Sequence, residues 1–212
     1  MFMRGLLLLS CLTVSLGASA QFINAGFENP VQSDGTFGNT LPGWTVAGGN
    51  AGAWNIFPSY SFFRSEAPEG TQIAYVNGTS LAQQSAVTLA AGETTLSVMA
   101  GRRSDTFAAS FDMELWAGGT VAAGVVTGGT LLGTASFIHT SIAPSSFTPL
   151  SVTYNASVND PLIGQQITAR FVKVGGSQMN FDDVKLNVVP EPATMSVLAI
   201  GLVAALRRSR KS

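Results

Sequence analysis

Hydrophobic and polar residues alternate along short stretches of the chain, which is the pattern of half-buried β-strands. The clearest stretch is Phe111–Leu115, whose three apolar side chains would share one face of a strand while its two acidic side chains share the other. Pairs of glycines, such as Gly118-Gly119 and Gly128-Gly129, indicate turns between such stretches. The other strands expected from the same reasoning are Phe22–Phe27, Gln72–Val76, Leu96–Ala100, Leu131–Phe137, Phe147–Tyr154, Ile167–Phe171 and Phe181–Leu186.

These strands predict an all-β domain over residues 21–189. No convincing amphipathic helix interrupts them, and about eight strands in a domain of this length are typical of a two-sheet jelly-roll sandwich. Composition agrees, because the chain has only 11% charged residues and 23 glycines, which suits an extracellular β-domain with many turns better than a helical bundle.

Residues 1–20 have the features of a cleavable signal peptide. Arg4 supplies the positive charge, an apolar stretch of about ten residues follows, and Ala18-Ser19-Ala20 is a small-x-small cleavage site. The stretch is short for a membrane span, which needs roughly 20 residues. We therefore expect a signal helix that signal peptidase removes, so that the mature chain starts at Gln21.

The C-terminus has three parts in a fixed order. Pro190-Glu191-Pro192 is followed by an apolar run, residues 193–206, and then by a basic cluster, residues 207–211. The apolar run predicts a transmembrane helix, and the basic cluster would hold its end in the cytoplasm. The last segment of the chain is therefore residues 190–212, a tail distinct from the domain.

This tail resembles the PEP-CTERM sorting signal of Gram-negative bacteria. The resemblance implies export and recognition of Pro190, Glu191 and Pro192 by an exosortase, a membrane cysteine protease-transpeptidase. It also implies a place at the cell surface or in the extracellular matrix, after transient anchoring in the inner membrane. Proteins of this kind usually occur in bacteria that make exopolysaccharide and biofilm matrix.

The domain carries a second resemblance. Its motifs are Asn24–Glu28, Leu41–Trp44, Ala67–Gln72 and Phe181–Leu186. Together they resemble the galactose-binding-like jelly rolls, which include many carbohydrate-binding modules. The resemblance implies a jelly-roll fold and suggests a sugar as ligand.

Catalytic and nucleic-acid-binding chemistry find little support in the sequence. The only histidine is His139 and the only cysteine, Cys11, lies in the leader, so neither a zinc cluster nor a catalytic triad is expected. Residues 21–189 contain 6 basic and 11 acidic residues, and a net charge near −5 does not attract phosphate backbones. No spacing singles out two carboxylates as a glycosidase pair. We therefore expect a domain that is not an enzyme.

Aromatic residues gather in one 20-residue stretch, residues 44–63. Sugars stack their apolar faces on such rings, so Trp54, Tyr60, Phe62 and Phe63 are the sugar-binding candidates, with burial in the core as the alternative. Trp44 is expected in the core. Arg102-Arg103 could hold an acidic sugar, although pairing with Asp105, Asp112 or Glu114 is the favoured reading.

Strand parity points to a structural calcium site. Asp182, Val184 and Leu186 would face the same way, so an inward Val184 would bury the Asp182 carboxylate, which then needs a compensating charge. Calcium prefers oxygen ligands, and in the jelly rolls that this domain resembles such an ion often joins the first and last strands. The matching positions are Glu28 and Asp182, with solvated turn residues as the alternative.

The sequence thus favours a non-catalytic surface protein that binds extracellular polysaccharide in a biofilm matrix. The alternative is a structural matrix or surface protein without a sugar site. A glycan-active enzyme is the more distant alternative.

Overall fold

The computed structural model describes residues 22–56 and 62–190. Within them the chain forms β-strands and one short 3₁₀ helix, His139–Ser141. The expected signal helix and transmembrane helix lie outside the described residues. The strands are β1 (Thr45–Ala47), β2 (Ala51–Asn55), β3 (Gln72–Val76), β4 (Ser80–Thr88), β5 (Gly92–Arg102), β6 (Ser110–Ala117), β7 (Thr120–Ala122), β8 (Val125–Thr127), β9 (Thr130–Phe137), β10 (Ser146–Ala156), β11 (Gln166–Gly175) and β12 (Met179–Pro190).

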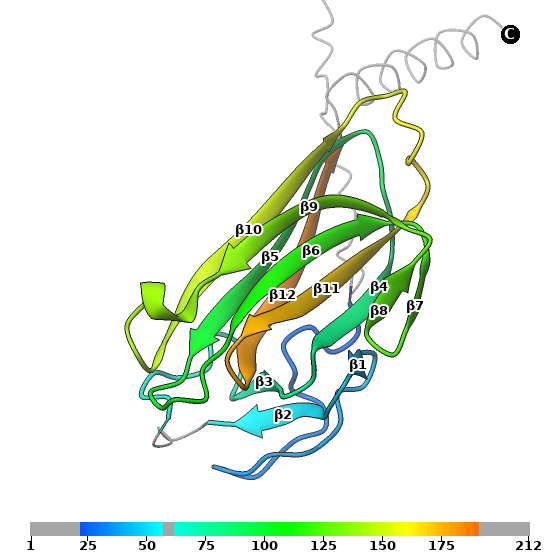
Figure 1. Cartoon of the computed structure of the whole chain (residues 1–212). Coiled ribbons are helices and arrows are strands. Elements are labelled where there is room, and N and C mark those ends of the chain that lie inside the picture. Colours follow the sequence, from blue (N-terminus) through cyan, green and yellow to red (C-terminus); the bar gives the residue numbers. More distant parts are fainter. Residues whose placement is uncertain (1–21, 57–61, 191–212) are drawn as a thin grey trace, which may run out of the picture.

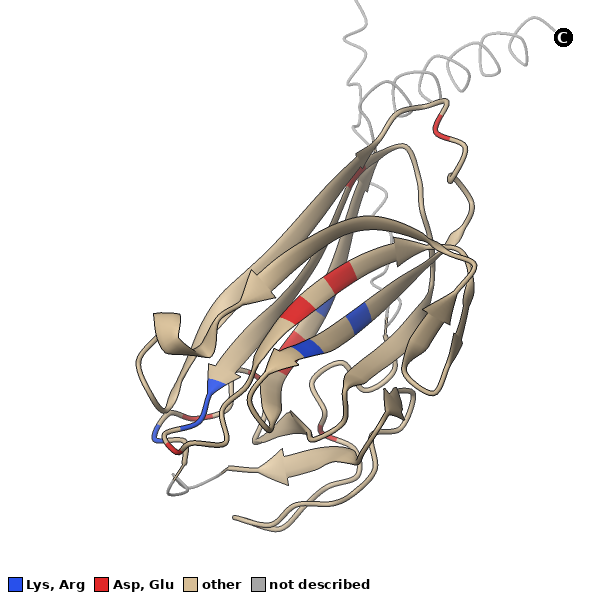
Figure 2. Ribbon diagram, viewed as in Figure 1, with Lys and Arg blue, Asp and Glu red and all other residues tan. Residues whose placement is uncertain are grey.

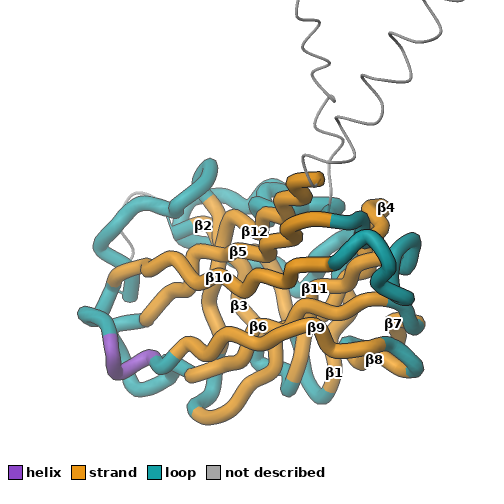
Figure 3. The backbone as a smooth tube through the Cα atoms, turned by 90° about the horizontal axis from the view of Figure 1, so that it is seen from above, coloured by secondary structure: helices purple, strands orange, loops and turns teal. Residues whose placement is uncertain are grey.

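The strands form two packed sheets, seen edge-on in Figure 3. One sheet has the order β1-β4-β11-β6-β9 and the other the order β10-β5-β12-β3-β2, while β7 and β8 form a separate hairpin (Figure 1). From β3 to β6 and again from β9 to β12, successive strands alternate between the two sheets. This arrangement confirms the predicted all-β two-sheet sandwich, with five strands in each sheet.

Alternation of side chains explains the layers. Along β6, buried and half-buried positions alternate without a break, and its apolar face meets the opposite sheet. On the outer face of the same sheet, Figure 2 shows acidic residues of β6 beside basic residues of β11. One such pair is Arg170 and Glu114, whose charged atoms are 3.1 Å apart.

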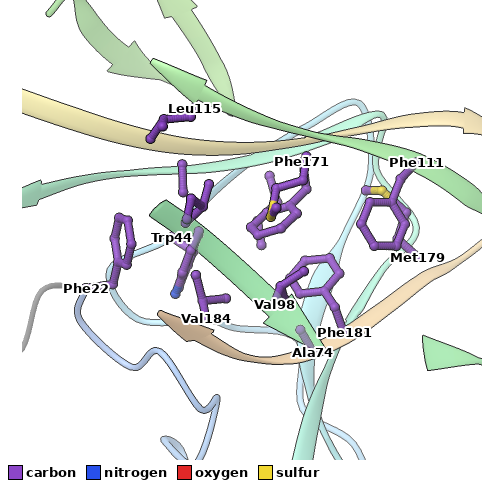
Figure 4. Packing of buried hydrophobic residues seen from close by; sticks show 14 of the residues in the cluster. Phe22, Trp44, Ala74, Val98, Phe111, Leu115, Phe171, Met179, Phe181 and Val184 are labelled. Carbon is purple, nitrogen blue, oxygen red and sulfur yellow. The ribbon is translucent and has the colours of Figure 1, made fainter. Parts of the chain in front are cut away.

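Aromatic rings fill the space between the sheets (Figure 4). Phe171 of β11 and Phe181 of β12 stack with ring centroids 4.3 Å apart, and Phe111 meets Phe181 at 5.6 Å. Trp44 closes the same core and is buried, as predicted. These rings supply much of the apolar burial that must stabilise a mature domain without disulfides.

The predicted first strand, Phe22–Phe27, is a turn. Asn24 and Phe27 both have positive φ values, 54° and 58°, and the Phe27 N–H donates to the Asn24 carbonyl over 3.2 Å. Such a backbone cannot continue a ladder, although the side chains of Phe22 and Phe27 are still buried in the core.

A second apolar cluster lies on the outer face of the β10-β5-β12-β3-β2 sheet. It consists of Trp54, Ile56, Phe63, Ile73 and Tyr75, and Phe147 of β10 packs against it. Phe63, in the segment that leads from β2 to β3, stacks on Phe147 with centroids 5.0 Å apart. Phe62 and Phe63 therefore cover part of the sheet, and Phe62 also lines the pocket described below.

No helix within the described parts of the chain is long and apolar enough to span a bilayer.

Candidate functional site

A pocket of about 360 Å³ opens beside the second apolar cluster. Strands β2 and β3 supply its floor, and the loops before β2 and after β5 supply its sides. We call it the aromatic pocket. Its lining residues are Gly35, Phe37, Asn50, Trp54, Phe62, Tyr75, Asn77, Arg103 and Gln178.

Four aromatic rings dominate the aromatic pocket. Trp54 and Tyr75 come from the adjacent strands β2 and β3 and point away from the sandwich core. Phe62 lies 6.1 Å from Trp54, and Phe37 meets Tyr75 edge-on at 5.7 Å and 83°. Rings that approach from strands and from loops offer both faces and edges to a planar ligand.

Arg103 forms a rigid wall of the aromatic pocket. Its guanidinium carbon lies 4.6 Å from the centroid of Phe62 and 5.3 Å from that of Trp54. Asp105 fixes the same group through two hydrogen bonds of 3.0 and 2.6 Å, and the side chain of Gln178 accepts a third. The pairing with Asp105 is one that the sequence predicted, and it offsets the charge of Arg103.

Side-chain amides form a continuous belt along the rim. Gln178 donates to Asn77 over 3.0 Å, and Asn77 donates to Asn50 over 2.9 Å. Asn50 in turn donates to Asn39 over 3.3 Å, and the Tyr75 hydroxyl reaches the same Asn39 oxygen at 2.7 Å. Neutral donors and acceptors therefore surround an apolar floor.

The titratable groups among the lining residues are Tyr75 and Arg103. Burial raises the pKa of the Tyr75 hydroxyl, so it stays neutral at physiological pH. His139 lies elsewhere, in the 3₁₀ helix, where its Nδ1 is 2.9 Å from the Ser110 hydroxyl. The pocket is therefore suited to a neutral, largely apolar ligand.

The four sugar-binding candidates have different positions. Trp54 and Phe62 line the aromatic pocket, and Phe63 is fully buried beneath it. Tyr60 falls outside the described residues. Tyr75 and the amide belt could not be predicted from the sequence, because these residues meet only through the alignment of β2, β3 and β12.

A second polar cluster joins the predicted calcium ligands to a residue that sequence reasoning missed, Glu69. The backbone N–H of Glu69 donates to Asp182 over 2.8 Å. The N–H groups of Thr71 and Gln72 donate to Glu28 over 3.0 and 2.7 Å. Glu28 and Asp182 therefore hold the same short segment, Glu69–Gln72, from two sides.

Glycines make room for this acidic cluster. A side chain at Gly26 would come within 2.0 Å of the Glu69 carboxylate, and one at Gly70 within 2.4 Å of the Glu28 carboxylate. Gly70 also has a φ of 57°, which other residues adopt at a cost. The sequence motifs Asn24–Glu28 and Ala67–Gln72 therefore pack closely against each other at this cluster.

Asp182 is buried as predicted, but on the other face of the sheet. A bulge between Asp182 and Lys185, with Asp183 at a φ of 55°, breaks the alternation, so Phe181 and Val184 both reach the core. Asp182 instead lies under the segment that contains Glu69. The parity argument was therefore wrong, although its conclusion about burial holds.

Burial raises the pKa of the Asp182 carboxyl to about 8, and the charges of Glu69 and Asp183 act in the same direction. Hydrogen bonds from the backbone N–H groups of Glu69 and Asp183 oppose the shift. Asp182 takes part in no ion pair with another described residue, so a cation would relieve a real electrostatic cost.

Across residues 22–56 and 62–190, no group of three or more His, Cys, Asp or Glu side chains is arranged to hold a metal ion. A calcium ion here would need Asp182 and Glu28 together with backbone carbonyls. The oxygens of Glu28 already accept hydrogen bonds from Thr71 and Gln72, so this ligand would have to share its lone pairs. The calcium site stays a prediction.

The fold and the aromatic pocket define a β-sandwich domain that offers an aromatic site on the outer face of one sheet. The family model described as HpiC1 cyclase matches residues 18–187. The chain therefore belongs to the HpiC1 cyclase-like family.

Solved structures agree with this assignment. A Stig cyclase, Fisc from Fischerella sp. TAU, in complex with (3Z)-3-(1-methyl-2-pyrrolidinylidene)-3H-indole, is 25% identical, with a TM-score of 0.66 over 80% of this chain and 96% of that one. A cyclase from the same source, in complex with 4-(1H-indol-3-yl)butan-2-one, is 25% identical, with a TM-score of 0.65 over 81% and 98%. Comparison with curated proteins finds no match.

The tail matches the PEP-CTERM protein-sorting motif over residues 188–211. This match supports the predicted resemblance and implies an exported protein that is sorted to the cell surface and processed by an exosortase.

The expectation that the domain is not an enzyme was wrong. The family is that of a cyclase, and the similar solved structures are cyclases. The expectation had rested on the absence of histidine, cysteine and carboxylate patterns, and such an absence does not exclude an enzyme.

Proposed function

We propose that the domain is a surface-sorted enzyme of the cyclase type, which binds a neutral, planar aromatic substrate in the aromatic pocket and promotes its ring closure. The observation that carries this proposal is the pocket itself, in which Trp54, Phe62, Phe37 and Tyr75 surround a space of about 360 Å³. Membership of a cyclase family supports the reaction class, and indole-type ligands in similar structures support the substrate class.

Positioning is the contribution that the pocket's residues make to catalysis. Ring closure is an isomerisation that joins two parts of one substrate molecule. A pocket that holds the substrate's side chain folded over its reacting ring therefore lowers the barrier by positioning alone. The wall of Arg103, fixed by Asp105, limits how the substrate can lie. The amide belt offers hydrogen bonds to the substrate's polar atoms.

The substrate class is tested with 4-(1H-indol-3-yl)butan-2-one as the probe. Calorimetry on the purified exported protein should detect binding, and Phe62→Ala should weaken it by about 1–2 kcal/mol through the loss of a ring contact. Phe107→Ala is the matched control, because the Phe107 ring centroid also lies near the Arg103 guanidinium carbon, at 5.6 Å, but Phe107 does not line the pocket. Equal losses in both variants would contradict a direct ring contact.

Polysaccharide binding is the second candidate. Two of the predicted sugar-binding rings, Trp54 and Phe62, line a pocket that also has an amide rim, and sugars use both kinds of contact. Xylohexaose in the same calorimeter separates the two functions. Binding of the oligosaccharide without binding of the indole probe would favour a sugar site and overturn the proposed substrate class.

A further inference from the structure

The sorting motif begins inside the folded sheet. Strand β12 runs from Met179 to Pro190, and Pro190 is the first residue of the motif. Its last three residues, Val188, Val189 and Pro190, pair in register with Thr94, Glu93 and Gly92 of β5. No spacer therefore separates the domain from the peptide that the sorting enzyme must take.

The end of β12 is held from one side. Strand β3 pairs with β12 only at Met179–Phe181, and among the described residues the stretch Lys185–Pro190 pairs with β5 alone. Strand β5 is backed by β10 as far as Gly92, which pairs with Ala156. Strand β5 therefore keeps β10 as a partner on its other edge when the end of β12 opens. The opening breaks only the ladder between β12 and β5.

The surface around this strand end is hollowed. A pocket of about 360 Å³ lies there, apart from the aromatic pocket. Glu93 and Val189, opposite each other on the two strands, are both exposed. The residues that line this terminal hollow are Gly92, Glu93, Asn155, Ala156, Ser157, Val189 and Pro190.

A transpeptidase nucleophile must reach the carbonyl of the bond it breaks, and the flanking chain must leave its sheet partner to enter an active site. We infer that the exosortase-type enzyme receives the motif only after Val188–Pro190 separate from β5. The folded sheet, and not a flexible linker, then restrains processing. Pro190 favours this opening, since it has no N–H to give to the ladder.

A disulfide across the last pairs tests this inference. Residues directly opposite each other on antiparallel strands have Cα atoms about 4.5–5.5 Å apart, within the range that a disulfide spans. The double variant Glu93→Cys with Val189→Cys would therefore tether β12 to β5. The chain's only cysteine, Cys11, lies in the predicted leader and would not compete in the mature protein.

We expect the tethered protein to lose its tail about tenfold more slowly than wild type, since the tether raises the free energy of local opening. Immunoblots of the exported protein against time would measure this rate. The two single-cysteine variants, and the double variant kept reduced, should be processed at the wild-type rate. Thermal melting of the purified double variant checks that it folds.

A flexible spacer provides the decisive comparison. Ten Gly and Ser residues inserted between Val189 and Pro190 leave Pro190-Glu191-Pro192 intact but move it beyond the tether. Processing of the tethered protein should then return to at least the wild-type rate. Wild-type processing of the tethered protein without a spacer would overturn the inference, and so would continued slow processing with one.

Discussion

The backbone N–H of Glu69 donates a hydrogen bond of 2.8 Å to the buried carboxylate of Asp182. This bond joins a loop on the outer face of the sheet to the bulge in β12, across 113 positions of the chain. Because Asp182 is completely buried and has no cation beside it among the described residues, its protonation is linked to folding.

Stability without metal should fall as the pH rises from about 4 to about 8. The ordinary pKa of Asp182 is 3.8 and the folded-state pKa is about 8, so within this window the folded state keeps a proton that the unfolded state has released. The free energy of unfolding therefore decreases with pH, with a slope of up to about 1.4 kcal/mol per pH unit. The stabilisation is complete below the unfolded pKa and is lost as the pH passes 8.

Urea unfolding in the presence of a chelator, at several pH values, measures this slope. Asp182→Asn should flatten the pH dependence, although it also removes one acceptor oxygen from the backbone N–H groups of Glu69 and Asp183. Glu66→Gln, at an exposed carboxylate on the same loop, should keep the wild-type slope. An unchanged slope in Asp182→Asn would show that another group carries the effect.

Calcium should raise the melting temperature above neutral pH. An ion bound at Asp182 and Glu28 keeps the buried carboxylate ionised, and a ligand held only by the folded state at one hundred times its Kd adds about 2.7 kcal/mol. Differential scanning calorimetry with calcium, magnesium or chelator measures the shift. Both Glu28→Gln and Asp182→Asn should abolish it, and a wild-type melting temperature that is insensitive to calcium would exclude the site.

Truncation of Phe181 should cost about 3–5 kcal/mol of unfolding free energy. Its ring stacks on Phe171 at 4.3 Å and contacts Phe27 and Phe111 at 5.6 Å, so Phe181→Ala opens a cavity where both sheets meet. Phe107→Ala is the matched control, since Phe107 is 54% exposed and its loss should change stability by about 0.5 kcal/mol or less. Similar losses in the two variants would contradict the central role of Phe181.

Strands whose two faces differ in polarity could be predicted from the sequence, and β6 is the clearest case. Strand β4, Ser80–Thr88, could not, because its buried positions include polar residues. Gln83 is buried there because its side chain hydrogen-bonds both the N–H and the carbonyl of Ile23, a partner 60 residues away. The local pattern of hydrophobic and polar residues cannot reveal a partner that lies so far away in the sequence.

Two of the four rings in the candidate site, Trp54 and Phe62, were predictable from the sequence, whereas Phe37, Tyr75 and the polar residues around the rings were not. Trp54 and Phe62 attracted attention because aromatic residues cluster near them in the sequence. Arg103 became a wall only because Asp105, Gln178 and the two rings meet around it, and these come from three separate parts of the chain. For Asp182, one bulge sufficed to reverse the predicted face.

Release of Arg103 from Asp105 should change which ligands the aromatic pocket prefers. In the wild type the Asp105 carboxylate lies 2.6 Å from the Arg103 guanidinium and offsets its charge, so neutral aromatic ligands are favoured. Asp105→Asn keeps one acceptor oxygen and the shape of the side chain but leaves the positive charge of Arg103 uncompensated at the pocket wall. An anionic ligand at about 4 Å would then gain several kcal/mol of attraction at an effective dielectric constant of about 20, before the cost of desolvation.

We therefore expect Asp105→Asn to bind indole-3-acetate at least about tenfold more tightly than wild type does, a gain of about 1.4 kcal/mol. Its affinity for the neutral 4-(1H-indol-3-yl)butan-2-one should change little. Asp112→Asn makes the same charge change on the outer face of the other sheet, where Asp112 accepts a hydrogen bond from Ser136, and should leave both affinities unchanged. Calorimetry at low and moderate salt measures the four affinities, and the gain should shrink as salt screens the charge. An equal gain for both ligands, or a gain that Asp112→Asn reproduces, would show that Arg103 does not govern the charge preference of the pocket.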